Sequence, residues 1–239
     1  GAIEKDPTTN GDFIDNSNDN TEVVFAGADY DEEVFTEDVT DYANDFIYAF
    51  NNETGYTLPA DIIVKQSLTL PEGKSFELDL NGKTISAINS ISDKNNDGKF
   101  TSADNVVFID VRGNLTVKNG TMTLKHTGDN YGWNACTELF YVAGNGVLNI
   151  EDATIENLGG SDMAYVVDMV NATNITVNVA NSTLKSTYIP FRVFNNGSGM
   201  NNVTINNSTL EGVSRAFWVH IYSNVDTKGN GVKSSTLNL

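Results

Sequence analysis

The hexapeptide Val117-Lys118-Asn119-Gly120-Thr121-Met122 decides the fold, because close copies of it recur along the 239-residue chain. Each copy has an apolar residue, then Asn or Asp, a small residue, Thr and a second apolar residue. Residues 150–155, 179–184 and 205–210 are further copies; residues 80–85 are a copy with one extra residue, and residues 233–237 are a weaker last copy. Repetition of this kind is typical of a solenoid.

The spacing of the copies gives the size of the repeat. Their threonines are residues 84, 121, 154, 183, 209 and 236, at steps of 37, 33, 29, 26 and 27 residues. Without a twelve-residue insert at 93–104 the first step is 25, and a second insert near 126–137 lengthens the next step. A period in the mid-twenties fits coils of three short strands and three turns, stacked in parallel about 4.8 Å apart. Leucine-rich repeats need a leucine framework that is absent here, and propeller blades are longer.

A resemblance to a known family lies at the start of the repeats. The run TLPADIIVKQSLTLPEGKSFELDLNGKTIS, residues 57–86, resembles the entry segment of the pectate-lyase-like β-helix proteins of bacteria. The resemblance covers roughly residues 40–239. It implies an all-β, right-handed, single-stranded parallel β-helix of about six coils with a short N-terminal capping helix. The same scaffold carries lyases, hydrolases, adhesins and inert stalks, so the resemblance does not imply one activity.

The chain divides into three predicted regions. Residues 1–30 are an acidic, polar tail that we expect to be partly disordered. Residues 31–60 form an N-terminal cap, because apolar residues within 37–50 recur at steps of three and four, which predicts a helix over the open end of the core. Residues 61–239 form the parallel β-helix with its inserts at 93–104 and 126–137. No capping element follows the last coil, which leaves its edge open to another domain or subunit.

The charge and the composition exclude several classes of partner. A net charge of −18 repels nucleic acid and anionic lipid, and also a polyanionic polysaccharide unless cations bridge the two. No apolar run is long enough to span a membrane. The resemblance implies an extracellular or cell-surface protein, and we expect that its signal segment has been removed, with a lipoprotein as one form of attachment. The single cysteine, Cys136, cannot form an intrachain disulfide and is expected to be a small buried side chain.

The insert at 93–104 has the spacing of a calcium-binding loop. Hard oxygen ligands at alternate positions, a glycine at the bend, a backbone carbonyl and a closing carboxylate are the elements that Ca²⁺ requires. The closing residue is Asp rather than Glu, as in dockerin-type loops, and a strand rather than a helix follows. The alternative is an Asp- and Asn-rich turn that matches by chance. The predicted ligands are the side chains of Asp93, Asn95, Asp97 and Asp104 and the carbonyl of Lys99.

Each coil also contains an aromatic-rich strand whose outward side chains suggest a binding surface. Strand alternation predicts that Arg192 and His220 point outward. Exposed rings beside polar groups suit a glycan, although the chain's own segments are an alternative cover. One predicted outward column contains Phe108, Tyr141, Val166, Arg192 and Trp218, and the next contains Asp110, Ala143, Asp168, Phe194 and His220.

The sequence leaves three functions open. The first is a non-catalytic glycan-binding or adhesion module, stabilised by calcium, that contacts its ligand through Tyr141, Arg192, Trp218 and His220. The second is a polysaccharide lyase or glycoside hydrolase that uses Asp110, Asp168 and Arg192. The characteristic motifs of the catalytic families are missing, which favours the first. The third is a structural spacer on the cell surface.

Overall fold

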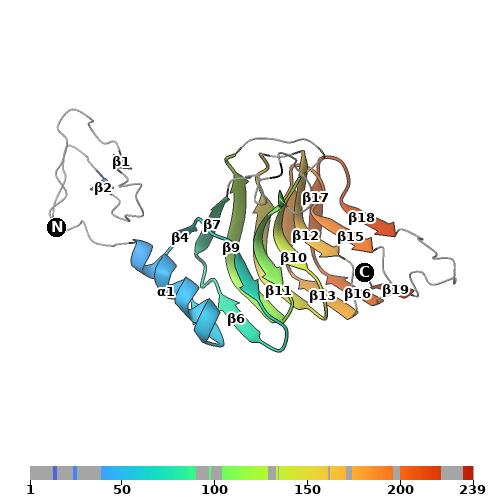
Figure 1. Ribbon diagram of the computed structural model, residues 1–239, viewed down its shortest axis with the longest axis horizontal. Coiled ribbons are helices and arrows are strands. Elements are labelled where there is room, and N and C mark those ends of the chain that lie inside the picture. Colours follow the sequence, from blue (N-terminus) through green and yellow to red (C-terminus); the bar gives the residue numbers. More distant parts are fainter. Residues whose placement is uncertain are drawn as a thin grey trace.

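The computed structural model describes residues 13–14, 24–25, 39–89, 97, 104–128, 133, 135–160, 162–170, 174–195, 200–221 and 234–238. Over these residues the chain is mostly β-strand, arranged in parallel sheets, with one short helix toward the N-terminal side (Figure 1). Within the predicted tail, the described residues are an antiparallel pair of strands, Phe13–Ile14 (β1) and Val24–Phe25 (β2).

Two large sheets contain the remaining described strands. The six-stranded sheet comprises β5 (Leu68–Leu70), β8 (Val106–Val111), β10 (Cys136–Val142), β12 (Met163–Val170), β15 (Phe191–Asn195) and β18 (Phe217–Ile221). The main path of the eleven-stranded sheet comprises β3 (Gly55–Thr57), β6 (Ser75–Asp79), β9 (Asn114–His126), β11 (Val147–Asn157), β13 (Asn174–Ala180), β16 (Met200–Asn206) and β19 (Ser234–Asn238). A side path of the same sheet comprises β4 (Ile62–Val64), β7 (Thr84–Asn89), β14 (Thr183–Ser186) and β17 (Thr209–Gly212), together with the C-terminal parts of β9 and β11.

Successive segments of the described chain belong to the main path, the side path and the six-stranded sheet in turn, and this order repeats from β3 to β19. The threonines of the sequence repeat lie side by side on the side path, since Thr84 pairs with Thr121, Thr121 with Thr154, Thr154 with Thr183, and Thr183 with Thr209. The prediction for the last copy is wrong. Thr236 pairs with Asn202 on the main path.

The Asn or Asp of each repeat makes the bend between the main path and the side path. A left-handed backbone is costly for most side chains and is tolerated best by Gly, Asn and Asp. This residue therefore lets the chain turn sharply without a long loop. The bend residues and their φ angles are Asn81 (51°), Asn119 (64°), Asp152 (50°), Asn181 (51°) and Asn207 (46°).

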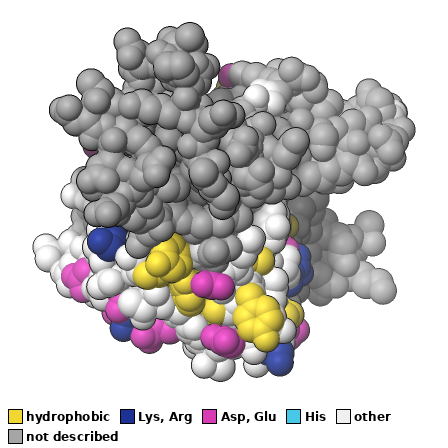
Figure 2. Space-filling view, turned by 90° about the vertical axis from the view of Figure 1, so that its left-hand side faces the viewer, with side chains coloured by type: hydrophobic (Ala, Val, Ile, Leu, Met, Phe, Trp, Pro, Cys, Tyr) yellow, Lys and Arg dark blue, Asp and Glu magenta, His cyan; other side chains and the backbone are white. Residues whose placement is uncertain are grey.

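The predicted N-terminal helix is present as α1 (Val39–Asn52), and it contacts β3, β4 and β5. Its apolar face packs on the first strands, with the Phe50 and Phe76 rings 4.9 Å apart and the Phe46 and Phe76 rings 6.4 Å apart. The other face contains Tyr48, which is 62% exposed. Figure 2 views this end of the molecule and shows small apolar patches among acidic and basic side chains. The predicted helix is thus present at the N-terminal side, and its apolar side chains join the core.

A single large core lies beneath both sheets and the helix. It contains buried Val, Leu, Ile and Phe side chains from α1 and from strands of both sheets. A buried side chain of this size contributes about 1.5–3 kcal/mol. On three strands of the six-stranded sheet two consecutive residues both pack in this core, which breaks the alternation of a regular strand. These pairs are Phe108 and Ile109, Leu139 and Phe140, and Val166 and Val167.

Candidate functional site

The outward side of the six-stranded sheet aligns acidic, basic and aromatic residues in one column. Asp110 pairs with Tyr141, Tyr141 with Asp168, Asp168 with Arg192, and Arg192 with Trp218. The predicted columns are therefore wrong on β8 and β12: Asp110 and Asp168 lie in the column that was predicted to contain Phe108 and Val166. Phe108 and Val166 are fully buried in the core, and the two aspartates take their places.

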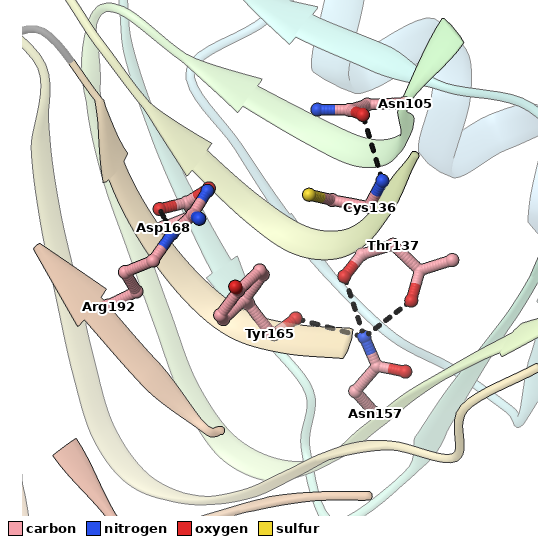
Figure 3. A network of polar contacts seen from close by, with 7 residues as sticks. All are labelled: Asn105, Cys136, Thr137, Asn157, Tyr165, Asp168 and Arg192. Carbon is pink, nitrogen blue, oxygen red and sulfur yellow. Dashed lines mark hydrogen bonds and ion pairs between the residues drawn. The ribbon is translucent and has the colours of Figure 1, made fainter. Parts of the chain in front are cut away.

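Arg192 and Asp168 form an ion pair beneath the surface of this face, as Figure 3 shows. The Arg192 Nε donates to Asp168 Oδ1 at 2.8 Å, and Nη2 donates to Oδ2 at 2.6 Å. Only 8% of the arginine side chain is exposed, and none of the aspartate side chain. Burial by itself would lower the pKa of Arg192, but the hydrogen bonds and charge of Asp168 outweigh it and raise that pKa. Arg192 is thus held as a cation and is not a proton acceptor.

Glu138, on β10, places a second carboxyl against this ion pair. Its side chain is fully buried, and neither oxygen has a hydrogen-bond donor among the described residues. Burial raises the pKa of Glu138 well above its ordinary value, and the charge of Asp168 and a hydrogen bond shared with it raise it further. Two carboxyls this close cannot both be ionised cheaply, so Glu138 holds the proton while Asp168 pairs with Arg192. Sequence reasoning missed Glu138, although an acidic residue inside the strand Cys136–Val142 was a visible signal.

Aromatic rings enclose the guanidinium of Arg192. Its Cζ atom lies 4.2 Å from the ring centroid of Tyr165, 4.7 Å from that of Phe194 and 5.9 Å from that of Trp218. The Trp218 and His220 rings stack, with centroids 4.6 Å apart and planes inclined by 19°. Burial and then the charge of Arg192 lower the pKa of His220. The result is a row of rings whose outer members, Trp218 and His220, are half-buried.

The row continues across the neighbouring strands. Tyr165 contacts Tyr188 edge-on, with centroids 5.7 Å apart, and Tyr188 contacts Trp133 in the same way at 5.5 Å. Trp133 is 65% exposed. Trp133, Tyr188, Tyr165, Arg192, Trp218 and His220 therefore form one continuous series of contacts, which we call the aromatic row.

Asn157, at the end of β11, anchors the strands beneath this row (Figure 3). Its Nδ2 donates to the Thr137 carbonyl at 3.1 Å and to the Tyr165 carbonyl at 3.0 Å, while its Oδ1 accepts from the Gly159 N–H at 2.9 Å. The backbone N–H of Cys136 donates to Asn105 Oδ1 at 2.8 Å. Cys136 itself is buried, and burial followed by the charge of Glu138 raises the pKa of its thiol, which makes it unreactive.

An open groove of about 500 Å³ lies at the Trp133 end of the aromatic row. Its volume falls within the range of about 300–1,000 Å³ that is typical of ligand sites. The groove combines aromatic rings with a hydroxyl, a carboxylate and a glycine-rich turn. Its lining residues are Trp133, Leu158, Gly159, Gly160, Asp162, Thr187 and Tyr188.

The remaining predicted site residues are placed as follows. Tyr141 is half-buried, and burial followed by the charge of Glu138 raises its pKa to about 12. Asp110 accepts from Arg112 at 3.1 Å and lies two strands from Asp168 in the same column. Of the calcium loop, Asp97 is exposed, and Asp104, two residues before the start of β8, is fully buried. Asp93, Asn95 and Lys99 lie outside the described residues. The part of the chain that the structure describes contains no cluster of three His, Cys, Asp or Glu able to hold a metal.

The described chain contains no helix long and apolar enough to cross a membrane. No family model matches the sequence, and neither a curated protein nor a solved structure matches the chain.

Proposed function

We propose that the chain is a secreted or cell-surface right-handed parallel β-helix of the pectate-lyase-like kind, and that it binds an extracellular polysaccharide without cleaving it. The repeated order of the three strand paths supports the helical closure, and parallel crossovers are almost always right-handed. The aromatic row is the observation that carries the binding function. Sugar rings stack on exposed aromatic side chains, and this row ends in rings that solvent reaches.

Tyr141, Trp218 and His220 are the ligand-contacting residues of this proposal. Each is half-buried, so part of each side chain is open to solvent. Arg192 has a supporting role, because its guanidinium is enclosed by rings and bonded to Asp168. It holds the Trp218 and Phe194 rings in place from beneath.

The buried acidic cluster favours binding over catalysis. A lyase would need a base, but Asp168 keeps Arg192 protonated. A glycosidase needs carboxyls about 5–5.5 or 6.5–9.5 Å apart, and Glu138 shares a hydrogen bond with Asp168 instead. Release of reducing ends or unsaturated products from any polysaccharide would overturn the non-catalytic part of the proposal.

Replacing Trp218 with alanine is expected to weaken polysaccharide binding about tenfold, the loss of about 1.4 kcal/mol that truncating an aromatic contact commonly causes. Affinity electrophoresis against glucan, mannan, galactan and polygalacturonate measures it. Tyr48→Ala is the matched control, because this ring is exposed on α1 and outside the aromatic row. Circular dichroism checks that both proteins are folded. If Trp218→Ala is then retarded by the polysaccharide as strongly as the wild-type protein is, Trp218 is not part of the site.

The proposal includes one bound Ca²⁺ that stabilises the insert at 93–104. Its ligands are the side chains of Asp93, Asn95, Asp97 and Asp104 and the carbonyl of Lys99. A carboxylate-rich donor set suits this hard cation. At a Ca²⁺ concentration ten times the Kd, binding to the folded state is expected to stabilise it by about 1.4 kcal/mol. Isothermal titration of the wild-type protein and Asp93→Ala tests the site. Heat in the wild type that is lost in the variant supports it, and no heat in either would sink it.

A further inference from the structure

The groove beside Trp133 has the construction of a sugar subsite. The Trp133 ring is 65% exposed, and its edge-on contact with Tyr188 holds the two rings at an interplanar angle of 72°. Tyr188 is fixed in turn, because its N–H donates to Ser186 Oγ at 3.1 Å and its carbonyl accepts from the Ser214 N–H at 3.0 Å. The two adjacent rings give the groove an apolar patch, and contiguous exposed apolar patches are a feature of binding sites.

A tightly packed glycine turn forms one wall of the groove. Gly159 and Gly160 have φ angles of 84° and 102°, a region that L side chains rarely adopt. A Cβ at Gly160 would lie 2.3 Å from the His126 carbonyl oxygen, and one at Gly159 would lie 2.6 Å from Thr187 Oγ1. The turn is also anchored, since the His126 N–H donates to the Gly159 carbonyl at 2.9 Å. A side chain at either position would therefore clash with the adjacent chain, so this wall of the groove requires two consecutive glycines.

The charge of the groove selects among sugars. Asp162 is exposed in the lining, and the chain as a whole carries −18. A carboxylate accepts hydrogen bonds from sugar hydroxyls but repels the carboxylates of a uronate. Thr187 adds a hydroxyl that donates and accepts. Among the described residues that line the groove, none is a Lys or Arg that would compensate an anionic ligand.

We propose that the groove between Trp133 and the Gly159–Gly160 turn is the principal ring-binding subsite of this face, and that it takes an uncharged pyranose. The sugar ring stacks on Trp133, and its hydroxyls bond to Asp162 and Thr187. This inference rests on the proposed glycan-binding function and adds the subsite and the class of sugar.

The test compares Trp133→Ala, Trp218→Ala and Tyr48→Ala by isothermal titration with soluble glucan, mannan, galactan and polygalacturonate. Trp133→Ala is expected to weaken binding of the neutral polysaccharide at least tenfold, with Trp133→Phe restoring most of it. Tyr48→Ala should bind as the wild type does. Because the ligand is uncharged, the affinity should change little between low and high salt.

The outcomes separate the subsite from the function. If Trp133→Ala binds as the wild type does while Trp218→Ala does not, the groove is not the subsite and glycan binding stands. If polygalacturonate binds more tightly than every neutral polysaccharide, the assigned sugar class is wrong. If the wild-type protein binds none of the four, both the subsite and the proposed function fail.

Discussion

Replacing Arg192 with leucine is expected to lower the free energy of unfolding by about 3–5 kcal/mol, because it leaves the carboxylate of Asp168 buried without its partner. The pair is bonded twice, at 2.8 and 2.6 Å, and Asp168 is fully buried beside Glu138. Such a loss is a large part of the total stability of a typical domain, about 5–15 kcal/mol. Urea unfolding at pH 7, followed by circular dichroism, measures it.

Two further variants show whether the unpaired charge causes the loss. Arg192→Lys keeps the cation but not the two-pronged geometry, so its stability should fall between the wild type and Arg192→Leu. Asp168→Asn combined with Arg192→Leu removes both charges and should be more stable than Arg192→Leu alone. If Arg192→Leu lowers the free energy of unfolding by less than about 1 kcal/mol, the pair contributes no more than an exposed surface ion pair, and its burial is contradicted.

Replacing Glu138 with glutamine is expected to stabilise the protein at neutral pH by about 1–3 kcal/mol, because the amide removes the cost of keeping a buried carboxyl protonated at a pH where the unfolded chain ionises it. The folded-state pKa of Glu138 is raised, so the folded protein keeps a proton that the unfolded chain releases above about pH 4.3. This carboxyl therefore costs no stability at lower pH and costs more as pH rises toward its folded pKa. A glutamine cannot ionise, and its amide can donate to Asp168.

The stability difference between Glu138→Gln and the wild type should grow as pH rises from 4 toward 8. Glu53→Gln is the matched control, because Glu53 is exposed directly after α1. Urea unfolding at five or six pH values compares the three proteins. A difference that is constant over this range would mean that Glu138 does not retain its proton in the fold.

The Arg192 and Glu138 variants should differ in their effect on the aromatic row. The guanidinium of Arg192 lies against Tyr165, Phe194 and Trp218, so its loss should also disorder the rings proposed to contact the glycan. Glu138→Gln should leave them in place and preserve binding. A buried cluster that supports an exposed surface in this way is consistent with a binding module.

Several features of the fold could be predicted from the sequence because they are local or periodic. The Asn or Asp of each repeat marks a left-handed bend, since few other residues tolerate that backbone. The threonine spacing predicted which residues would lie side by side, from Thr84 to Thr209. The apolar steps of 37–50 predicted the helix at the N-terminal side, whose apolar side chains join the core. Each of these depends on backbone preference or on one face of one element.

The site could be predicted only in part, because the alternation of inward and outward side chains breaks on β8, β10 and β12. Two consecutive core residues, such as Leu139 and Phe140, shift every outward position after them, and no periodic pattern shows this in advance. The sequence predicted that Tyr141, Trp218 and His220 are partly open to solvent, as they are in the structure, but it did not indicate Glu138 or the Trp133 groove.

The sequence alone determined the repeat, its bends and the parallel strands, since these follow from residue preferences that act at short range. The tertiary structure decided that Asp168 meets Arg192 out of solvent, that Glu138 lies beside them as a protonated acid, and that Trp133 and a glycine turn line one groove. Burial and the pairing of charges depend on which segments lie against one another in space, and residues 20 to 60 positions apart come together only when the strands stack.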